Sequence, residues 1–267
     1  MSEQLSVNVS MASCDRIALL EAAMKILLSR GQNYLLSELH AVEFDRLTPF
    51  LEPVLLTRGD ILYHAETTMR FAYFPTTAIV SVDSTLADGS TVELASIGNE
   101  GLVGLPIYLG GATSSTRAIV RITGRCYRIA AAHLLDEFYR HGPLLKLLLR
   151  YAQSMMAQLG QRVVCNGHHS AEQRLCTFIL QMMDRTFAVE FAITHEEMGH
   201  LLGIRRETVT ESASRLQELG LIKYRRGHVK VAQRSGIAAR SCECYKIISD
   251  DNARLLPNRK LSTAQLA

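Results

Sequence analysis

The residues best suited to chemistry lie in one short segment that begins at Ile193. It contains His195-Glu-Glu-Met-Gly-His200, whose composition is similar to that of a zinc-protease helix. In such a helix the two histidines are four residues apart, about 40° around the axis, whereas a spacing of five separates them by about 140°. One zinc ion cannot bind side chains on both faces, so we exclude a metalloprotease.

The same segment continues with basic and acidic residues that suit the reading of DNA bases. Arginine can bridge O6 and N7 of guanine, and glutamate can accept a hydrogen bond from N4 of cytosine. We predict a base-reading set of Arg205, Arg206, Glu207, Thr208 and Glu211. A mixed Arg-Glu set favours base reading over simple charge neutralisation.

A helix-turn-helix is the element that would position these residues. Thr194 followed by Glu197 forms a capping box that starts a first helix, and Gly203 supplies the turn. Arg205 or Arg206 then opens a second helix, whose buried face is Val209, Ala213 and Leu216. The exposed N-terminal end of this second helix would enter a major groove.

A β-hairpin wing follows the second helix. From Leu221 to Val231 apolar and basic residues alternate about an Arg-Gly-His turn, which is typical of a hairpin that carries its basic residues on one face. We predict phosphate contacts from Thr194, His195, Thr210, Arg225, Arg226, His228 and Lys230.

Charge along the chain supports a nucleic-acid partner. The 267 residues have a net charge of +3, but Ile193 to Arg240 contains nine Lys or Arg and five Glu, a local charge of +4. The basic excess is therefore confined to the helix-turn-helix and wing, as expected of a nucleic-acid footprint.

Two further elements precede the helix-turn-helix. Between Pro53 and Ala130, seven short β-rich runs alternate with turn signals, which predicts an antiparallel barrel or jelly roll. A long helix follows His141-Gly142-Pro143 and carries two apolar stripes. One stripe has heptad spacing, and we predict that it pairs with the same helix of a second chain. This dimerisation stripe is Leu145, Leu149, Ala152, Met156, Leu159 and Val163. The alternative is a helix wholly buried in a monomer.

The order of barrel, long helix, Ile193 to Val209 and wing resembles the Crp/Fnr family of bacterial transcription regulators, across roughly Phe50 to Val231. The resemblance implies a homodimer with a cyclic-nucleotide-binding-like jelly roll and a C-terminal winged helix. It also implies that Arg206 and Glu207 are the main base-reading pair. The family often has an arginine one turn later, where this chain has Glu211, so the usual half-site is not expected.

A second departure from the family concerns the effector. Members that bind cyclic nucleotides use a Gly-Glu-Leu turn and a later Arg-Ser pair, for which this chain has Gly104-Leu105-Pro106 and Thr116-Arg117-Ala118. The groups that would hold the ribose and the phosphate are missing, and strand alternation points Arg117 to the other side. We therefore predict that cAMP does not bind in the usual way. The oxygen-sensing members hold an iron-sulfur centre with an N-terminal cysteine cluster. This chain has only Cys14 in that region, so we do not expect an iron-sulfur centre.

The predicted fold class is α+β, with an N-terminal jelly roll, a long dimerisation helix and a C-terminal winged helix-turn-helix. The predicted parts are a helical extension (1–30), a sensor domain (31–141), the dimerisation helix (142–166), a DNA-binding domain (167–235) and a C-terminal extension (236–267). The sequence leaves open the role of the last part, the target operator, and whether the protein activates or represses.

The remaining features predict neither a metal site nor a cofactor, and the effector is unidentified. Cys165 with His168 and His169 could approach Cys242 and Cys244 and form a redox or metal sensor, but nothing local joins the two segments, so we interpret these cysteines as buried or idle thiols. No apolar run is long enough to cross a membrane and no secretory signal is readable, so we expect a cytoplasmic protein.

The expected partners are double-stranded DNA, a second copy of the chain and, as a further candidate, RNA polymerase; no catalytic residue is predicted. One alternative stays open, a small-molecule-binding or metal-dependent cupin-like barrel whose C-terminal helices bind another protein. It has little support among the histidines, because His64 has no His-x-His partner in the strand region.

Overall fold

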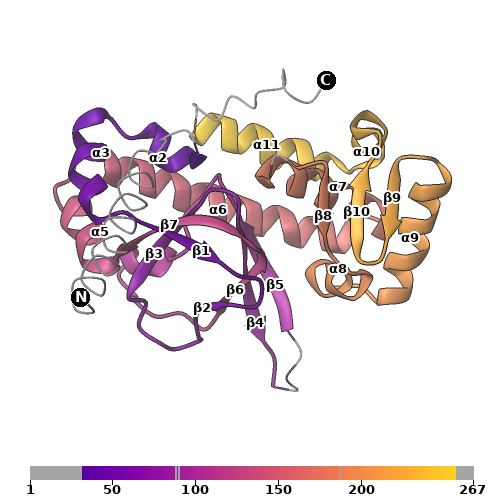
Figure 1. Ribbon diagram of the computed structural model, residues 1–267, viewed down its shortest axis with the longest axis horizontal. Coiled ribbons are helices and arrows are strands. Elements are labelled where there is room, and N and C mark those ends of the chain that lie inside the picture. Colours follow the sequence, from indigo (N-terminus) through magenta and orange to yellow (C-terminus); the bar gives the residue numbers. More distant parts are fainter. Residues whose placement is uncertain (1–31, 88, 90, 187, 257–267) are drawn as a thin grey trace, which may run out of the picture.

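The computed structural model describes residues 32–256 except 88, 90 and 187, so the predicted N-terminal extension and Cys14 lie outside the described residues. Seven antiparallel strands form the N-terminal domain (Figure 1). They are β1 (Glu52–Leu56), β2 (Ile61–Tyr63), β3 (Phe71–Pro75), β4 (Ile79–Thr85), β5 (Thr91–Ile97), β6 (Arg117–Ile122) and β7 (Gly124–Ala130). The sheets have the orders β1-β7-β3 and β2-β6-β4-β5, which confirms the predicted jelly roll.

One apolar core fills the roll. Alternate residues of the strands point inward, as Ala118 and Val120 of β6 do, while Arg117 and Arg121 point outward. Short helices accompany the roll: α2 (Tyr34–Glu38), α3 (Ala41–Leu47), the 3-10 turn η2 (Thr48–Phe50), α4 (Leu105–Tyr108) and α5 (Ala131–Phe138). Buried residues of α2, α3, α4 and α5 join the core of the roll.

The long helix α6 (Pro143–His168) runs along the roll and on toward the C-terminal domain (Figure 1). Pro143 occupies its first turn, where the missing N–H breaks no helical hydrogen bond. One of its two apolar stripes is buried in the core of the roll: Leu144, Leu148, Tyr151 and Met155. The Tyr151 hydroxyl also donates a 3.0 Å hydrogen bond to the carbonyl of Leu102.

The C-terminal domain has a core of its own. It comprises α7 (Ala171–Thr186), β8 (Glu190–Ala192), α8 (His195–Leu202), α9 (Arg206–Glu218), β9 (Ile222–Arg225) and β10 (His228–Val231). The three strands form a small sheet of order β8-β10-β9. Apolar residues of α7, α8, α9 and the sheet form the second core, which Ile79 of β4 also enters.

Two helices that the sequence analysis left unassigned follow the winged helix. Helix α10 (Arg234–Arg240) packs on α7, and α11 (Glu243–Leu255) runs back along α6 (Figure 1). Buried Asn252 of α11 accepts hydrogen bonds from Ser154 and, at 3.2 Å, from Gln158 of α6. Within the described residues, no helix is long and apolar enough to cross a membrane.

Candidate nucleic-acid interface

Helix α8 begins at a capping box, as predicted. The Thr194 hydroxyl accepts a hydrogen bond from the backbone N–H of Glu197, and the Glu197 carboxylate accepts one of 2.9 Å from the backbone N–H of Thr194. Burial acts to raise the pKa of Glu197, but these hydrogen bonds and the Arg58 guanidinium outweigh it and hold the pKa below its usual value. The capped end of α8 is thus also joined to the roll through the ion pair of Arg58 with Glu197.

The turn between α8 and α9 depends on two glycines. Gly203 has φ 61°, the left-handed conformation that favours glycine at the end of a helix. A side chain at Gly199 would lie 2.9 Å from the carbonyl oxygen of Ile204, so only glycine allows the turn to pass this close. The buried face of α9 consists of Val209, Ala213 and Leu216, as predicted.

The N-terminal end of α9 is open to a ligand. Arg205 is its N-cap and makes no capping hydrogen bond from its side chain, so no N-cap side chain satisfies the first N–H groups of the helix. Arg205, Arg206, Glu207 and Glu211 are exposed, and Thr208 is half-buried. Among the described residues, none of the four charged side chains forms an ion pair.

His195 joins α8, α9 and the wing. Its ring stacks on Tyr224 at 4.0 Å between centroids, and its Nδ1 lies 2.9 Å from the Thr210 hydroxyl. That hydroxyl donates its single hydrogen to the carbonyl of Arg206 at 3.0 Å, so Nδ1 of His195 is the donor to Thr210. Burial, and secondarily the charge of Arg206, lower the pKa of His195. The side chains of Thr194, His195 and Thr210, predicted above as phosphate contacts, therefore already have partners within the protein.

The wing is a tight hairpin with a basic tip. Strands β9 and β10 pair in register, and the turn residues Arg226 and Gly227 have φ 50° and 78°, the type I′ geometry that suits the twist of a hairpin. Arg225 and Arg226 are exposed and form no ion pair within the described residues. His228 and Lys230 each lie 3.9 Å from a carboxylate oxygen of Glu190 on β8.

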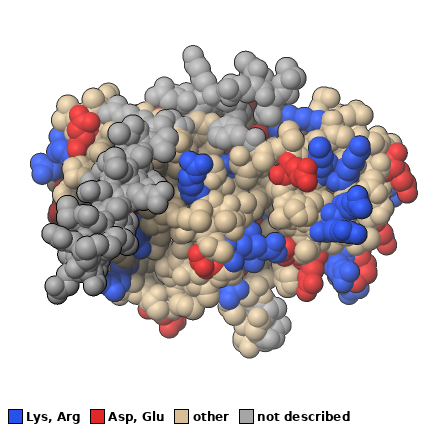
Figure 2. Space-filling view, in the orientation of Figure 1, with Lys and Arg blue, Asp and Glu red and all other residues tan. Residues whose placement is uncertain are grey.

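Figure 2 shows Lys and Arg gathered over the winged-helix part of the chain, interspersed with Asp and Glu. Helix α9 contributes acidic residues to this surface. Glu207, Glu211 and Glu218 lie on its exposed face, opposite Val209 and Leu216. A carboxylate on this surface is repelled by most of the acceptor-rich base edges of DNA and is attracted to a cytosine amino group, whereas an arginine beside it can bind guanine acceptors.

The second stripe of α6 faces outward. Leu149, Met156, Leu159 and Val163 are 48%, 64%, 39% and 73% exposed in the single chain, whereas Leu145 is half-buried and Ala152 is buried. An exposed apolar row of this length is unusual on a monomer and is typical of an interface.

The predicted effector position includes Thr116 and Arg117. The Thr116 hydroxyl lies 2.7 Å from the Ser114 hydroxyl and also bonds to Tyr63, whose pKa is raised chiefly by burial. Arg117 points out of the roll, as predicted, and lies 3.7 Å from the buried carboxylate of Asp83.

A series of polar contacts continues from Asp83 to the helix-turn-helix. Ser81 bonds to Asp83 and, at 2.7 Å, to Glu93, and Glu93 pairs at 2.9 Å with Arg162 of α6. Arg162 in turn donates to the carbonyl of Leu201 at the end of α8. The β2-β6-β4-β5 sheet is thus joined to α8 through a continuous series of polar groups.

Cys165, Cys242 and Cys244 are buried free thiols, as predicted, and the structure also brings them together. Cys165, His169, Cys242 and Cys244 lie together, with their ligand atoms within 4.8 Å of one another. They meet because α10 and α11 return the chain to the end of α6, which no local signal predicts. In the part of the chain that the structure describes, no other group of three or more metal-ligating side chains occurs, and none lies in the roll.

These features define a two-domain protein in which a jelly roll is joined by a long helix to a winged helix-turn-helix. Residues 53–141 match the family model of the cyclic nucleotide-binding domain, and residues 173–240 match that of the Crp-like helix-turn-helix domain. Together the two matches cover more than half of the chain. The chain belongs to the Crp/Fnr family and is a transcription regulator with a helix-turn-helix DNA-binding domain, not an enzyme.

Solved structures agree on the fold. FixK2 from Bradyrhizobium japonicum is 18% identical, with a TM-score of 0.63 over 72% of this chain and 98% of its own. The c-di-GMP-responsive global regulator CLP from Xanthomonas campestris is 14% identical, with a TM-score of 0.58 over 72% of this chain and 99% of its own. A CRP-family transcriptional regulator from Thermus thermophilus is 16% identical, with a TM-score of 0.59 over 70% of this chain and 96% of its own. A comparison with curated protein sequences finds no match.

Proposed function

We propose that this protein is a homodimeric regulator that binds a pseudo-palindromic operator, with one recognition helix α9 in each of two successive major grooves. The observation that carries the proposal is the open N-terminal end of α9, where Arg206 and Glu207 are exposed and unpaired beside the basic wing tip. Half-site centres would lie about 34–36 Å apart, one turn of B-DNA.

In this proposal Arg206 reads a guanine, and Glu207 and Glu211 read cytosine amino groups, with Arg205 and Thr208 beside them. Arg225 and Arg226 bind phosphates, with His228 and Lys230 next to them on the wing. The side chains of Thr194, His195 and Thr210 have internal partners. We therefore propose that these three residues support phosphate binding indirectly, by holding α8, α9 and the wing together.

The outward stripe of α6 supplies the proposed dimer contact, with Leu149, Met156, Leu159 and Val163 at its centre. The domain boundaries given from the sequence follow as part of this proposal: a sensor (31–141), a dimerisation helix (142–166), a DNA-binding domain (167–235) and a C-terminal extension (236–267). We propose a cytoplasmic site of action, and RNA polymerase as a partner.

We also propose that the sensor does not bind cAMP in the usual way. Leu105 and Thr116 stand where the family has its ribose-binding glutamate and phosphate-binding arginine, and Thr116 already bonds to Ser114 and Tyr63. A different effector would have to act on the roll or at the boundary between the two domains.

Selection of binding sites from a random duplex pool, with purified protein at physiological salt, tests the proposal. We expect an enriched inverted repeat with about one helical turn between half-site centres. Arg206→Ala should weaken specific binding by about 1–3 kcal/mol and relax one base position in each half-site. Equal loss on all sequences would contradict base reading by Arg206.

A matched pair of variants tests the wing. Arg225→Ala should weaken binding to every duplex alike and lower the salt slope by about 1. Arg125→Ala, which removes an exposed arginine from the jelly roll, should change neither quantity. An unchanged salt slope for Arg225→Ala would remove the wing from the interface.

A further inference from the structure

Three cysteines and one histidine meet where the end of α6 touches the start of α11. Cys165 and His169 are four residues apart, so they share a face of the last turn of α6, and His169 is the C-cap of that helix. Cys242 is the N-cap of α11, and Cys244 lies in its first turn. The two segments are separated by more than 70 residues of sequence, and all three thiols are buried.

Two separations between the side chains are close to those around a single tetrahedral ion. The sulfurs of Cys165 and Cys242 are 3.6 Å apart, and Cys244 Sγ lies 3.3 Å from Nδ1 of His169. A tetrahedral zinc ion with Zn–S bonds of about 2.3 Å and a Zn–N bond of about 2.0 Å places two sulfurs about 3.8 Å apart and a sulfur and a nitrogen about 3.5 Å apart. These two separations differ from the tetrahedral values by a few tenths of an ångström, and all four ligand atoms lie within 4.8 Å of one another.

The surrounding groups are those that orient metal ligands. Nε2 of His169 lies 3.2 Å from the Glu243 carboxylate, and Nδ1 lies 3.3 Å from Cys244 Sγ, on the side of the ring that faces the cluster. A ligating histidine ordinarily donates its second ring N–H to a carboxylate in this way. Gln161 Nε2 donates to Cys244 Sγ at 3.1 Å, and the Thr177 hydroxyl lies 3.1 Å from Cys242 Sγ, so two sulfurs also have hydrogen-bond partners.

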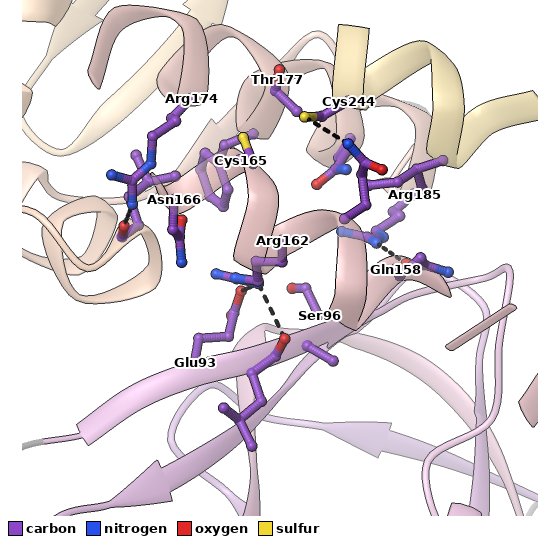
Figure 3. A pocket seen from close by; sticks show the side chains of 17 residues that line it. Glu93, Ser96, Gln158, Arg162, Cys165, Asn166, Arg174, Thr177, Arg185 and Cys244 are labelled. Carbon is purple, nitrogen blue, oxygen red and sulfur yellow. Dashed lines mark hydrogen bonds and ion pairs between the residues drawn. The ribbon is translucent and has the colours of Figure 1, made fainter. Parts of the chain in front are cut away.

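Charge at the site is also compensated. Three thiolates and a neutral imidazole around a divalent ion leave one net negative charge. Arg174, which is buried on α7, interacts electrostatically with Cys165 and Cys242 and donates to the carbonyl of Leu202. Figure 3 shows Cys165, Cys244, Arg174 and Arg162 around one cavity of about 70 Å³ between the two domains.

We propose that Cys165, His169, Cys242 and Cys244 bind one Zn²⁺ ion in a closed Cys₃His site. Soft thiolate ligands and four-coordinate geometry select zinc over magnesium or calcium, and the compact ligand set suits one ion. Metal binding displaces the three thiol protons to solvent and involves no redox step. The ion would tie α11 to the end of α6, next to the residues that bind the carbonyls of Leu201 and Leu202.

Metal analysis of the full-length protein, purified under reducing conditions, tests the site. We expect about one zinc per chain. After replacement of zinc by cobalt, we expect the visible and near-ultraviolet absorption of tetrahedral cobalt with thiolate ligands. Protein that has no zinc, and that takes up neither zinc nor cobalt with an affinity better than micromolar, would overturn the proposal. So would stoichiometric iron with sulfide, or a Cys165–Cys242 disulfide in protein kept reduced.

Two matched pairs of variants assign the ligands. His169→Ala should lower zinc affinity by at least 100-fold, whereas His168→Ala, one residue away and exposed, should leave it unchanged. Cys244→Ser should act like His169→Ala, and Cys176→Ser, which removes a buried thiol outside the cluster, should not. Glu243→Ala should weaken binding by about 10- to 100-fold. Equal affinity of His168→Ala and His169→Ala would contradict the site, and the cobalt titration of the unaltered protein remains informative if a variant does not fold.

Discussion

Replacement of Met156 by glutamate should dissociate the proposed dimer. Met156 lies in the outward stripe of α6 and is 64% exposed in the single chain. Full burial of a methionine side chain contributes about 1.5–3 kcal/mol, so burial of its exposed part contributes about 1–2 kcal/mol. In a symmetric dimer each subunit contributes one Met156, so the lost burial is doubled to about 2–4 kcal/mol. This loss raises the dissociation constant by about 30- to 700-fold. The buried charge of glutamate adds to this loss.

The matched control is Ala157→Glu, which places the same charge one residue further along, about 100° around the helix, at an exposed position outside the stripe. Sedimentation velocity over a range of protein concentrations measures both dissociation constants. The double variant Met156→Glu with Val163→Glu should be monomeric and should bind one half-site of the operator. If Met156→Glu leaves the dimer as tight as Ala157→Glu does, the stripe is not the interface and the assignment of α6 is refuted.

Three further predictions concern the winged helix and the roll. Arg226→Asn should stabilise the protein by up to about 1 kcal/mol in thermal unfolding, because asparagine tolerates φ 50° better than arginine does. The same variant should bind all duplexes more weakly, because it loses a charge at the wing tip. Unchanged binding would show that the wing tip does not touch DNA. The lowered pKa of His195 means that the unfolded chain takes up a proton first as pH falls below about 6.5, so stability should drop through that range. His195→Gln should reduce this drop in a comparison of melting temperatures at pH 7.5 and 5.5, whereas the same change at exposed His200 should not; equal drops would contradict the role of His195. Isothermal titration with cAMP should show no saturable binding, because Thr116 carries no charge to hold the phosphate, and tight binding would show that other groups replace the missing arginine.

Whether an element can be predicted from the sequence depends on how far apart along the chain its interacting residues lie. Thr194 and Glu197 cap α8 through bonds between residues three apart, and Gly203 ends the helix through its own φ, so both are readable in sequence. The wing turn at Arg226 and Gly227 is similarly local. The strands of the roll are predictable because turn residues separate short apolar runs.

Periodicity shows that α6 has two apolar stripes, but it does not show which stripe the roll covers. Packing decides that Leu148 and Tyr151 are buried and that Met156 is exposed. His195 illustrates the same limit: its residue type suits a phosphate contact, and only its position between Tyr224 and Thr210 shows that it holds the domain together.

By itself, the amino-acid sequence determined the helix-turn-helix, the wing, the seven strands and the long helix, because short-range hydrogen bonds and periodic burial form these elements. The tertiary structure decided which distant residues meet. Arg162 reaches the end of α8, and Cys165 and His169 meet Cys242 and Cys244, only because α10 packs on α7 and α11 runs back along α6. Residues that far apart in sequence are brought together by the packing of whole helices, and the spacing of residues along the chain carries no information about it.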